Sequence, residues 1–162
     1  MTEGTKDAPT YRVLFVCTGN TCRSPMAEAI ARRRLAERGW SGVDVASAGV
    51  AAWGGGAASG GAVRAAAGHG LDLSDHTSTL LTEEAVESAD LILTMSASHL
   101  TRVTELGGGD RAEIITAFGG AGSSGGVPDP IGGPDEEYLA TYEVLSDLIE
   151  GALERIQPMM MP

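Results

Sequence analysis

One stretch constrains this chain more than any other: residues Val13–Pro25, which read VLFVCTGNTCRSP. The first four form a continuous apolar run, typical of a strand buried on both faces of a parallel sheet. The turn Cys17–Arg23 follows, and we expect Ser24 to cap the next helix with Pro25 at its first position. A strand, a tight turn and a helix N-terminus in this order form an anion-binding site.

A cysteine inside an anion-binding site is a candidate thiolate. Cys17 is predicted to lie beside a helix N-terminus and Arg23, and both make a thiol more acidic. The backbone amides of residues 18–23 would stabilise the thiolate and then three phosphoryl oxygens, while the planar guanidinium of Arg23 can bind two of them. Gly19 lets the backbone approach the anion, and Asn20 tolerates a left-handed conformation.

The alternative for Cys17 is an inert cysteine in the core, which is the usual role of a lone cysteine. Here the Gly-Asn turn, an arginine six residues after the cysteine and a Ser-Pro helix start coincide in one short stretch. This coincidence favours a reactive thiol.

Length and charge limit the remaining possibilities. We expect one domain, residues 11–157, between a disordered leader at 1–10 and a frayed tail at 158–162. The formal net charge is −11, which argues against nucleic acid or an anionic membrane as the main partner. No secretion signal or membrane segment is visible, and the two cysteines are five residues apart, so a cytoplasmic location is expected. No zinc-type ligand spacing occurs, so neither a metal nor a cofactor is implied.

The pattern of apolar segments predicts the α/β class: a single three-layer domain with a four-stranded open parallel sheet, helices on both faces and the phosphate-binding loop after the first strand. Strands are expected at residues 11–16, 43–46, 91–95 and 114–117, and helices at 24–38, 62–67, 82–88, 96–106 and from 135 onward. In such sheets ligands bind beyond the carboxyl ends of the strands. Cys17, Ser47 and Met95 lie at such ends.

A thiolate nucleophile also needs an acid that protonates the leaving group. Asp129 is the best candidate, because Pro128 and Pro130 fix its backbone. The same Asp-Pro pair is also a common turn, so the residues alone leave both roles open for Asp129.

Cys22 also has two interpretations. It either fills space at the base of the loop or acts as a resolving thiol that forms a reversible disulfide with Cys17. An accessible thiolate beside a second cysteine favours the redox role. The three histidines, His69, His76 and His99, are scattered along the chain, and we expect solvated or capping roles for them.

The order of four motifs resembles the low-molecular-weight protein tyrosine phosphatases: Cys17–Pro25, Ser47-Ala48-Gly49, Leu91–Met95 and Asp129-Pro130. The resemblance implies a phosphatase with a phosphocysteine intermediate. Cys17 would then attack phosphorus, Ser24 would ease departure of the thiolate, and Asp129 would act first as acid and then as base.

The resemblance also implies how the phosphoryl group is held. Arg23 would bind it together with the phosphate-binding loop, formed by Thr18, Gly19, Asn20, Thr21 and Cys22. His76 is expected to brace this loop, as the matching family histidine does, and Ser47 to support it.

Threonine at position 21 resembles the bacterial protein-arginine phosphatase branch, since tyrosine-specific members usually have an aliphatic residue there. Three other segments resemble that branch as well: Leu81–Glu84, Glu87–Asp90, and Asp129-Pro130 followed by Gly132-Gly133. The implied substrate is phosphoarginine on phosphorylated proteins. A small polar Thr21 suits a P–N bond and is expected to help position the hydrolytic water.

Tyrosine-specific members carry aromatic residues directly after the Asp-Pro pair, and the arginine branch often has one, whereas this chain has Ile131 and then Gly132. This departure weakens a phosphotyrosine assignment and leaves Trp53 as the expected aromatic wall. Thr21, Trp53 and Ile131 are therefore the residues expected to determine the substrate.

Three alternatives to a phosphoarginine phosphatase remain on the sequence. The first is a protein tyrosine phosphatase of the same family. The others belong to a different class: a redox-sensing dithiol protein, or an anion-binding protein without turnover. A thioredoxin-coupled arsenate reductase shares the expected architecture but needs a third cysteine, and the chain has two.

Overall fold

The computed structural model of the protein describes residues 11–120 and 125–160. Four parallel strands form one sheet in the order β2-β1-β3-β4. The strands are β1 (Tyr11–Cys17), β2 (Val43–Gly49), β3 (Leu91–Thr94) and β4 (Ala112–Ile114). The predicted four-stranded parallel sheet is confirmed.

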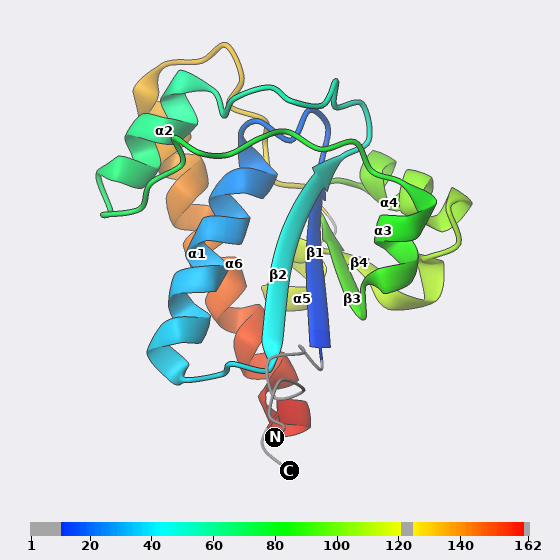
Figure 1. Ribbon diagram of the computed structural model, residues 1–162. Helices are drawn as coiled ribbons and strands as arrows, with labels where there is room; N and C mark the ends of the chain where they lie inside the picture. The colour runs from blue at the N-terminus through cyan, green and yellow to red at the C-terminus, as the bar shows by residue number, and fades with distance from the viewer. Residues whose placement is uncertain (1–10, 121–124, 161–162) are drawn as a thin grey trace, which may run out of the picture.

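Helices cover both faces of this sheet. They are α1 (Arg23–Arg38), α2 (Gly60–Ala67), α3 (Glu83–Ser88), α4 (Ala97–Glu105), α5 (Ile115–Gly119) and α6 (Asp135–Met160), with a 3-10 turn, η2 (Gly109–Arg111), before β4. Figure 1 shows α1, α2 and α6 on one side of the sheet and α3 and α4 on the other. The predicted three-layer α/β class is therefore confirmed.

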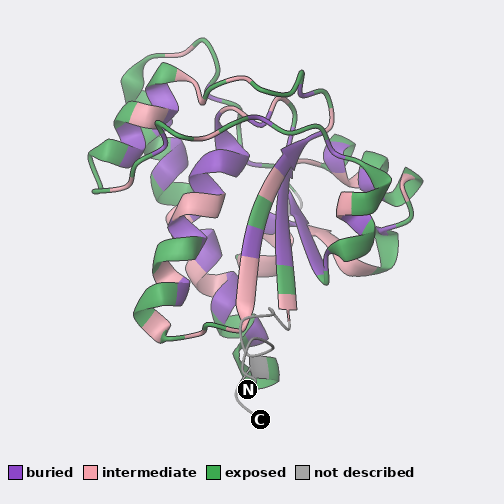
Figure 2. Ribbon diagram, viewed as in Figure 1, coloured by how far each residue is buried: buried purple, intermediate pink, exposed green. Residues whose placement is uncertain are grey.

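Alternate side chains of β1 enter the two halves of the core, as the two-residue period of a strand requires. Val13 and Phe15 belong to the larger cluster, which includes the buried face of α1 and most of the buried side chains of α6. Leu14 and Val16 belong to the smaller cluster under α3 and α4. Figure 2 shows the buried residues in purple, concentrated along β1, β3 and the inner face of α1.

The predicted fourth strand, residues 114–117, is wrong in its bounds. Strand β4 ends at Ile114, and α5 begins at Ile115, which is completely buried. Packing against α6 explains the difference: a Cβ on Gly119 would lie 2.0 Å from the Leu148 carbonyl oxygen, so the two helices approach backbone to backbone. This tertiary contact overrides the β-propensity of the Ile-Ile-Thr run.

The structure describes most of the predicted C-terminal tail but none of the predicted N-terminal leader. The predicted leader, residues 1–10, lies outside the described residues. The predicted frayed tail began at Pro158, but α6 continues through Pro158 to Met160; residues 161–162 are not described. Within residues 11–120 and 125–160, no helix combines the length and apolar composition that a membrane crossing requires.

Candidate active site

The loop after β1 is wound around the carboxyl end of that strand. Helix α1 begins at Arg23, and the first helical bond runs from the Met26 N–H to the Cys22 carbonyl at 3.2 Å, so Cys22 is the N-cap. The prediction of Ser24 as N-cap is therefore wrong. Ser24 lies inside the first turn, and its hydroxyl is engaged with side chains of the loop instead of the helix backbone.

The sulfur of Cys17 is surrounded by hydrogen-bond donors. The Asn20 N–H donates to Sγ at 3.3 Å, and the Ser24 Oγ lies 2.9 Å from Sγ. Because the Ser24 hydroxyl already accepts a bond from the Asn20 Nδ2 at 2.8 Å, its own proton is free to point at the sulfur. This is the environment that stabilises a thiolate.

Asn20 ties the loop to the rest of the protein. It is buried and has a φ of 58°, and it is the one non-glycine residue with positive φ in the described part of the chain. Its Nδ2 donates to Ser24 at 2.8 Å and to Ser47 at 2.9 Å, and its Oδ1 accepts from the Thr79 N–H at 2.8 Å. Its carbonyl oxygen lies 2.8 Å from the His76 Nε2. Ser47 and His76 are thus placed where loop support was expected.

A pocket of about 170 Å³ opens above the loop. Its lining consists of Cys17, Thr18, Gly19, Thr21, Cys22, Arg23, Asp129 and Ile131. The structure therefore brings together eight of the residues predicted for the site, from segments more than 100 positions apart.

Arg23 has one donor without a protein partner. Its Nη1 donates to the Val127 carbonyl at 2.9 Å, and its Nη2 lies 3.3 Å from the Thr18 Oγ1 and 3.4 Å from the Asp129 Oδ2. Among the described residues, the buried Nε of Arg23 makes no hydrogen bond. Buried donors are normally paired. Because Arg23 lines the pocket, this N–H is a candidate donor to an anion bound there.

Asp129 lies at the mouth of the pocket. Its Oδ1 accepts from the Ile131 N–H at 3.1 Å, which forms an Asx turn, and its Oδ2 faces Arg23. The carboxyl side chain is 40% exposed. Asp129 therefore forms a turn and also lies in the pocket lining; its role as general acid stays a prediction.

His99 is the site residue that sequence reasoning missed. It is 2% exposed, with Nε2 2.8 Å from the Thr18 Oγ1 and Nδ1 3.1 Å from the Ser96 Oγ. Burial, together with the positive charge of Arg23, lowers its pKa to about 4, although Asp129 opposes the shift. One sequence feature could have identified His99: it lies in the first turn of the helix that follows β3, and β3 pairs with the strand that ends in Cys17.

The second cysteine, Cys22, is the last residue of the phosphate-binding loop. The Cys22 Sγ is 3.0 Å from the Ser59 Oγ and 3.8 Å from the Tyr138 hydroxyl. Both cysteines are free thiols and both line the pocket. A disulfide between Cys17 and Cys22 stays a prediction.

A larger hollow of about 400 Å³ lies beside Ser47 and His76, the two residues that contact Asn20 of the loop. Its lining includes Glu28, Ser47, Asp72, Asp75 and His76. Three carboxylates make it unsuitable for an anion, and neither Cys17 nor Arg23 reaches it. In the described part of the chain, no group of three or more His, Cys, Asp or Glu side chains is arranged to hold a metal ion.

Comparison with known sequences places this geometry in a family. The profile described as low molecular weight phosphotyrosine protein phosphatase matches residues 12–159. The chain belongs to this family. It is accordingly a cysteine-dependent phosphatase, a hydrolase, as the resemblance of the loop implied.

Members with two different substrates match the chain. The protein-arginine-phosphatase of Bacillus subtilis (strain 168) is 41% identical over 146 residues, which cover 90% of this chain and 96% of the relative. The low molecular weight protein-tyrosine-phosphatase Etp of Escherichia coli (strain K12) is 36% identical over 133 residues, which cover 82% of this chain and 86% of Etp.

A solved structure of a bacterial family member has the same fold. The YwlE arginine phosphatase, in a Cys-to-Ser mutant with a phosphorylated active-site serine, superimposes with a TM-score of 0.85 at 38% identity. The match covers 90% of this chain and 95% of that one. The predicted resemblance to the arginine branch of this phosphatase family is confirmed.

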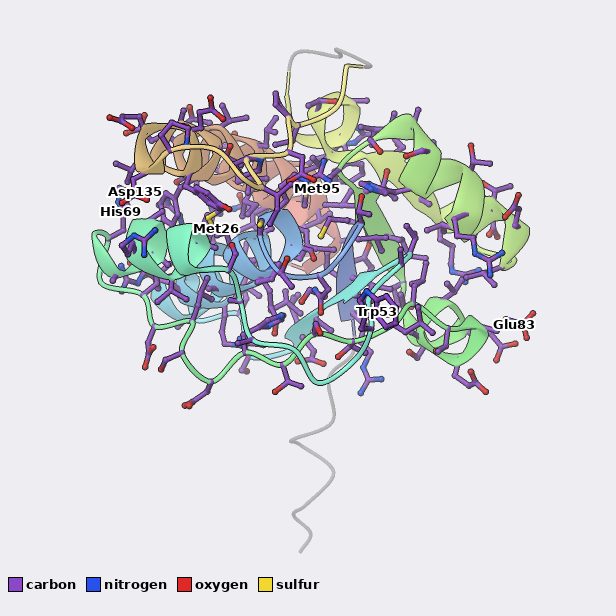
Figure 3. The ribbon with its side chains drawn as sticks, turned by 90° about the horizontal axis from the view of Figure 1, so that it is seen from above. Met26, Trp53, His69, Glu83, Met95 and Asp135 are labelled. Atoms are coloured by element: carbon purple, nitrogen blue, oxygen red, sulfur yellow. The ribbon has the colours of Figure 1, made fainter. Side chains whose placement is uncertain are left out.

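Of the three residues predicted to determine the substrate, two line the pocket and one does not. Thr21 and Ile131 line the pocket of this phosphatase. Trp53 is 100% exposed and is absent from the pocket lining. Figure 3, which looks down on the carboxyl edge of the sheet, places Trp53 on the side of α3, opposite Asp135. A role for Trp53 as an aromatic wall stays a prediction.

Proposed function

We propose that this phosphatase hydrolyses phosphoarginine on proteins through a phosphocysteine intermediate. Cys17 is the nucleophile in this proposal, and Asp129 is the general acid and then the general base. The observation that carries the choice of substrate is Thr21: a threonine lines the pocket beside the thiol. Its hydroxyl has a weak contact, 3.8 Å to the Cys22 Sγ, and so is available to a substrate or water.

The similarity to known arginine phosphatases supports this choice. A relative of that name is 41% identical and matches almost its entire length. Ile131, which replaces an aromatic residue expected in tyrosine-specific members, is 57% exposed at the pocket mouth. A flexible guanidinium chain fits beside an aliphatic side chain, whereas a phenyl ring gains most from aromatic partners.

The first step transfers the phosphoryl group to sulfur. The Cys17 thiolate attacks phosphorus, the S–P bond forms and the P–N bond breaks. The leaving guanidino nitrogen takes its proton from Asp129. The loop amides and the free Nε–H of Arg23 bind the oxygens, on which negative charge is held through the transition state.

The second step returns the enzyme to its starting state. Water attacks phosphorus and gives its proton to the Asp129 carboxylate, and the electrons of the S–P bond return to sulfur. The Ser24 hydroxyl, 2.9 Å from the Cys17 Sγ, stabilises the departing thiolate with a hydrogen bond. In this proposal the hydroxyl of Thr21, which lines the pocket with Cys17, orients the attacking water.

A protein tyrosine phosphatase is the second candidate. It is favoured by the 36% identity to Etp, which bears that name. A redox sensor, or an anion-binding protein without turnover, would hydrolyse neither phosphoarginine nor any phosphate ester. Comparing the activity of wild type with that of Cys17→Ser tests this. Equal activity of the two proteins would exclude Cys17 as nucleophile.

The deciding experiment compares kcat/KM on phosphoarginine and phosphotyrosine peptides of the same sequence. Wild type is expected to prefer phosphoarginine, and Thr21→Ile to shift the ratio toward phosphotyrosine by about tenfold or more, because a single polar contact discriminates by that order. Thr21→Ser keeps the hydroxyl and serves as the matched control. A wild-type preference for phosphotyrosine would overturn the arginine assignment.

Cys22 as resolving thiol completes the proposal. Peroxide would oxidise the Cys17 thiolate to a sulfenic acid, and the Cys22 thiol would then displace water to form the disulfide. Such protection suits a reducing cytoplasm, the location we propose. Peroxide-treated wild type is expected to recover full activity with dithiothreitol, whereas Cys22→Ser loses activity irreversibly.

A further inference from the structure

Two residues 81 positions apart meet above the edge of the sheet. Thr18 directly follows β1, and His99 lies in the first turn of α4, just after β3, its neighbour in the sheet. The His99 Nε2 is 2.8 Å from the Thr18 Oγ1, a shorter distance than any other polar contact of the ring. The pairing of β1 with β3 thus brings a buried imidazole against the phosphate-binding loop.

The Thr18 hydroxyl joins this ring to the guanidinium of Arg23. The Arg23 Nη2 lies 3.3 Å from the same Thr18 oxygen and donates to it. A hydroxyl has one proton and two lone pairs. Because Arg23 occupies one lone pair, the ring nitrogen takes either the other lone pair or the proton. Both tautomers of His99 therefore fix the orientation of the hydroxyl.

The orientation of Arg23 depends on few contacts. The Val127 carbonyl holds Nη1, and Thr18 and Asp129 hold Nη2. Asp129 is partly exposed and has a separate proton-transfer role in the proposed reaction. This leaves Val127 and Thr18 as the fixed partners that hold the guanidinium of Arg23, a residue of the pocket lining, in one orientation.

We propose that His99 is a positioning residue for phosphoryl transfer, acting through the Thr18 hydroxyl on the guanidinium of Arg23. The inference rests on the proposed function, because the effect is expressed only if Arg23 stabilises a phosphoryl group. His99 itself does not line the pocket. Its contribution is to hold one donor of the transition-state site in place before the substrate arrives.

The surroundings of the ring fit this role. The ring is buried beside the charged groups of Arg23 and Asp129 and bonded to the Ser96 hydroxyl on its other side. Its lowered pKa keeps it uncharged near neutral pH. A neutral imidazole can orient Thr18 without adding a second cation that would draw the anion away from Arg23.

A double-mutant cycle tests the inference with para-nitrophenyl phosphate as substrate. Thr18→Val and His99→Ala are each expected to lower kcat/KM by about tenfold, the size of one lost hydrogen bond in a buried site, mainly through kcat. In the double variant kcat/KM is also expected to fall about tenfold, not a hundredfold. Both changes remove the same chain of hydrogen bonds from His99 through Thr18 to Arg23. His99→Gln, which can reach Thr18 with an amide group, is expected to recover most of the activity.

Val103→Ala is the matched control for stability. Val103 is fully buried on the same helix, in the cluster on the far side of β1 and β3 from α1. It is expected to lower Tm as His99→Ala does while leaving kcat/KM unchanged below the melting range. Losses that multiply in the double variant, or full activity in folded His99→Ala, would overturn the inference.

The binding of inorganic anions separates this inference from the proposed function. Titration calorimetry with vanadate and phosphate is expected to show weaker vanadate binding in Thr18→Val and His99→Ala, with a smaller loss for phosphate, because vanadate resembles the transition state. If wild type hydrolyses neither phosphoarginine nor any phosphate ester, the proposed function fails. The vanadate and phosphate affinities of the variants then still decide whether His99 acts through Thr18.

Discussion

Gly49 touches the backbone of Thr18 so closely that the position has no room for a side chain. A Cβ at Gly49 would lie 2.5 Å from the Thr18 carbonyl oxygen and 2.8 Å from the Asn20 nitrogen. The end of β2 and the phosphate-binding loop are held together here by two bonds, from Val50 to the Cys17 carbonyl and from Ala51 to the Thr18 carbonyl, both 2.9 Å.

Gly49→Ala is therefore expected to displace the loop and to lower kcat/KM by about a hundredfold, because a shift of about 1 Å in a catalytic group costs that much. Overpacking of about 1–3 kcal/mol also lowers Tm by several degrees. Steady-state kinetics and calorimetry measure the two effects. Gly68→Ala is the control: its nearest atom would be 3.5 Å away and its φ is −61°, so activity should stay within error and Tm should not fall.

Asn20 combines a left-handed backbone with side-chain bonds, and two substitutions separate these contributions. Asn20→Gly keeps the conformation, which glycine adopts without strain, but removes the bonds to Ser24, Ser47 and Thr79. Asn20→Ala removes the same bonds and adds about 1–2 kcal/mol of backbone strain. Both variants are expected to lose kcat similarly, while urea denaturation should find the alanine variant less stable by about that strain energy. Wild-type kcat in the glycine variant would show that the side chain does not organise the loop.

The prediction of the fold succeeded where local pattern and tertiary packing agree. The apolar run before Cys17 and the spacing of Ala27, Ile30 and Leu35 identified β1 and the buried face of α1, and all of these side chains are buried. The pattern failed at residues 114–117, where close helix packing at Gly119 decides the conformation. The β-propensity of a four-residue segment says nothing about which helix packs against that segment.

The predicted site residues that the structure brings together share one segment or one recognisable pair. Cys17–Ser24 and Asp129 belong to these, and the structure brings Asp129 within 3.4 Å of Arg23. His99 was missed because its role depends on strand order, which places α4 beside the loop. The predicted capping role of Ser24 is wrong: its hydroxyl contacts Cys17 rather than the helix backbone, because Cys22 already provides the N-cap.

Asp129→Asn is expected to lower kcat/KM on phosphoarginine by about 10²–10⁴-fold, since an amide cannot protonate the leaving nitrogen. The loss should be smaller on para-nitrophenyl phosphate, whose phenolate leaves without full protonation. In wild type the alkaline limb of the pH dependence of kcat/KM reports loss of the acid's proton, and this limb should be absent in the variant. An unchanged profile would assign the acid to another residue.

The buried ring of His99 makes stability depend on pH. Its pKa is about 4 in the folded protein, lowered by burial and by Arg23, against about 6.5 in an unfolded chain. The unfolded chain thus binds a proton that the folded protein does not, and stability is lost as the pH falls from 6.5 toward 4. Between pH 7 and pH 5 the loss from this group is about 2 kcal/mol, a window in which most carboxyl groups stay ionised. Urea denaturation of wild type and His99→Gln at both pH values measures it as the difference between the two proteins, and the same pH dependence in both would show that His99 does not bind the proton.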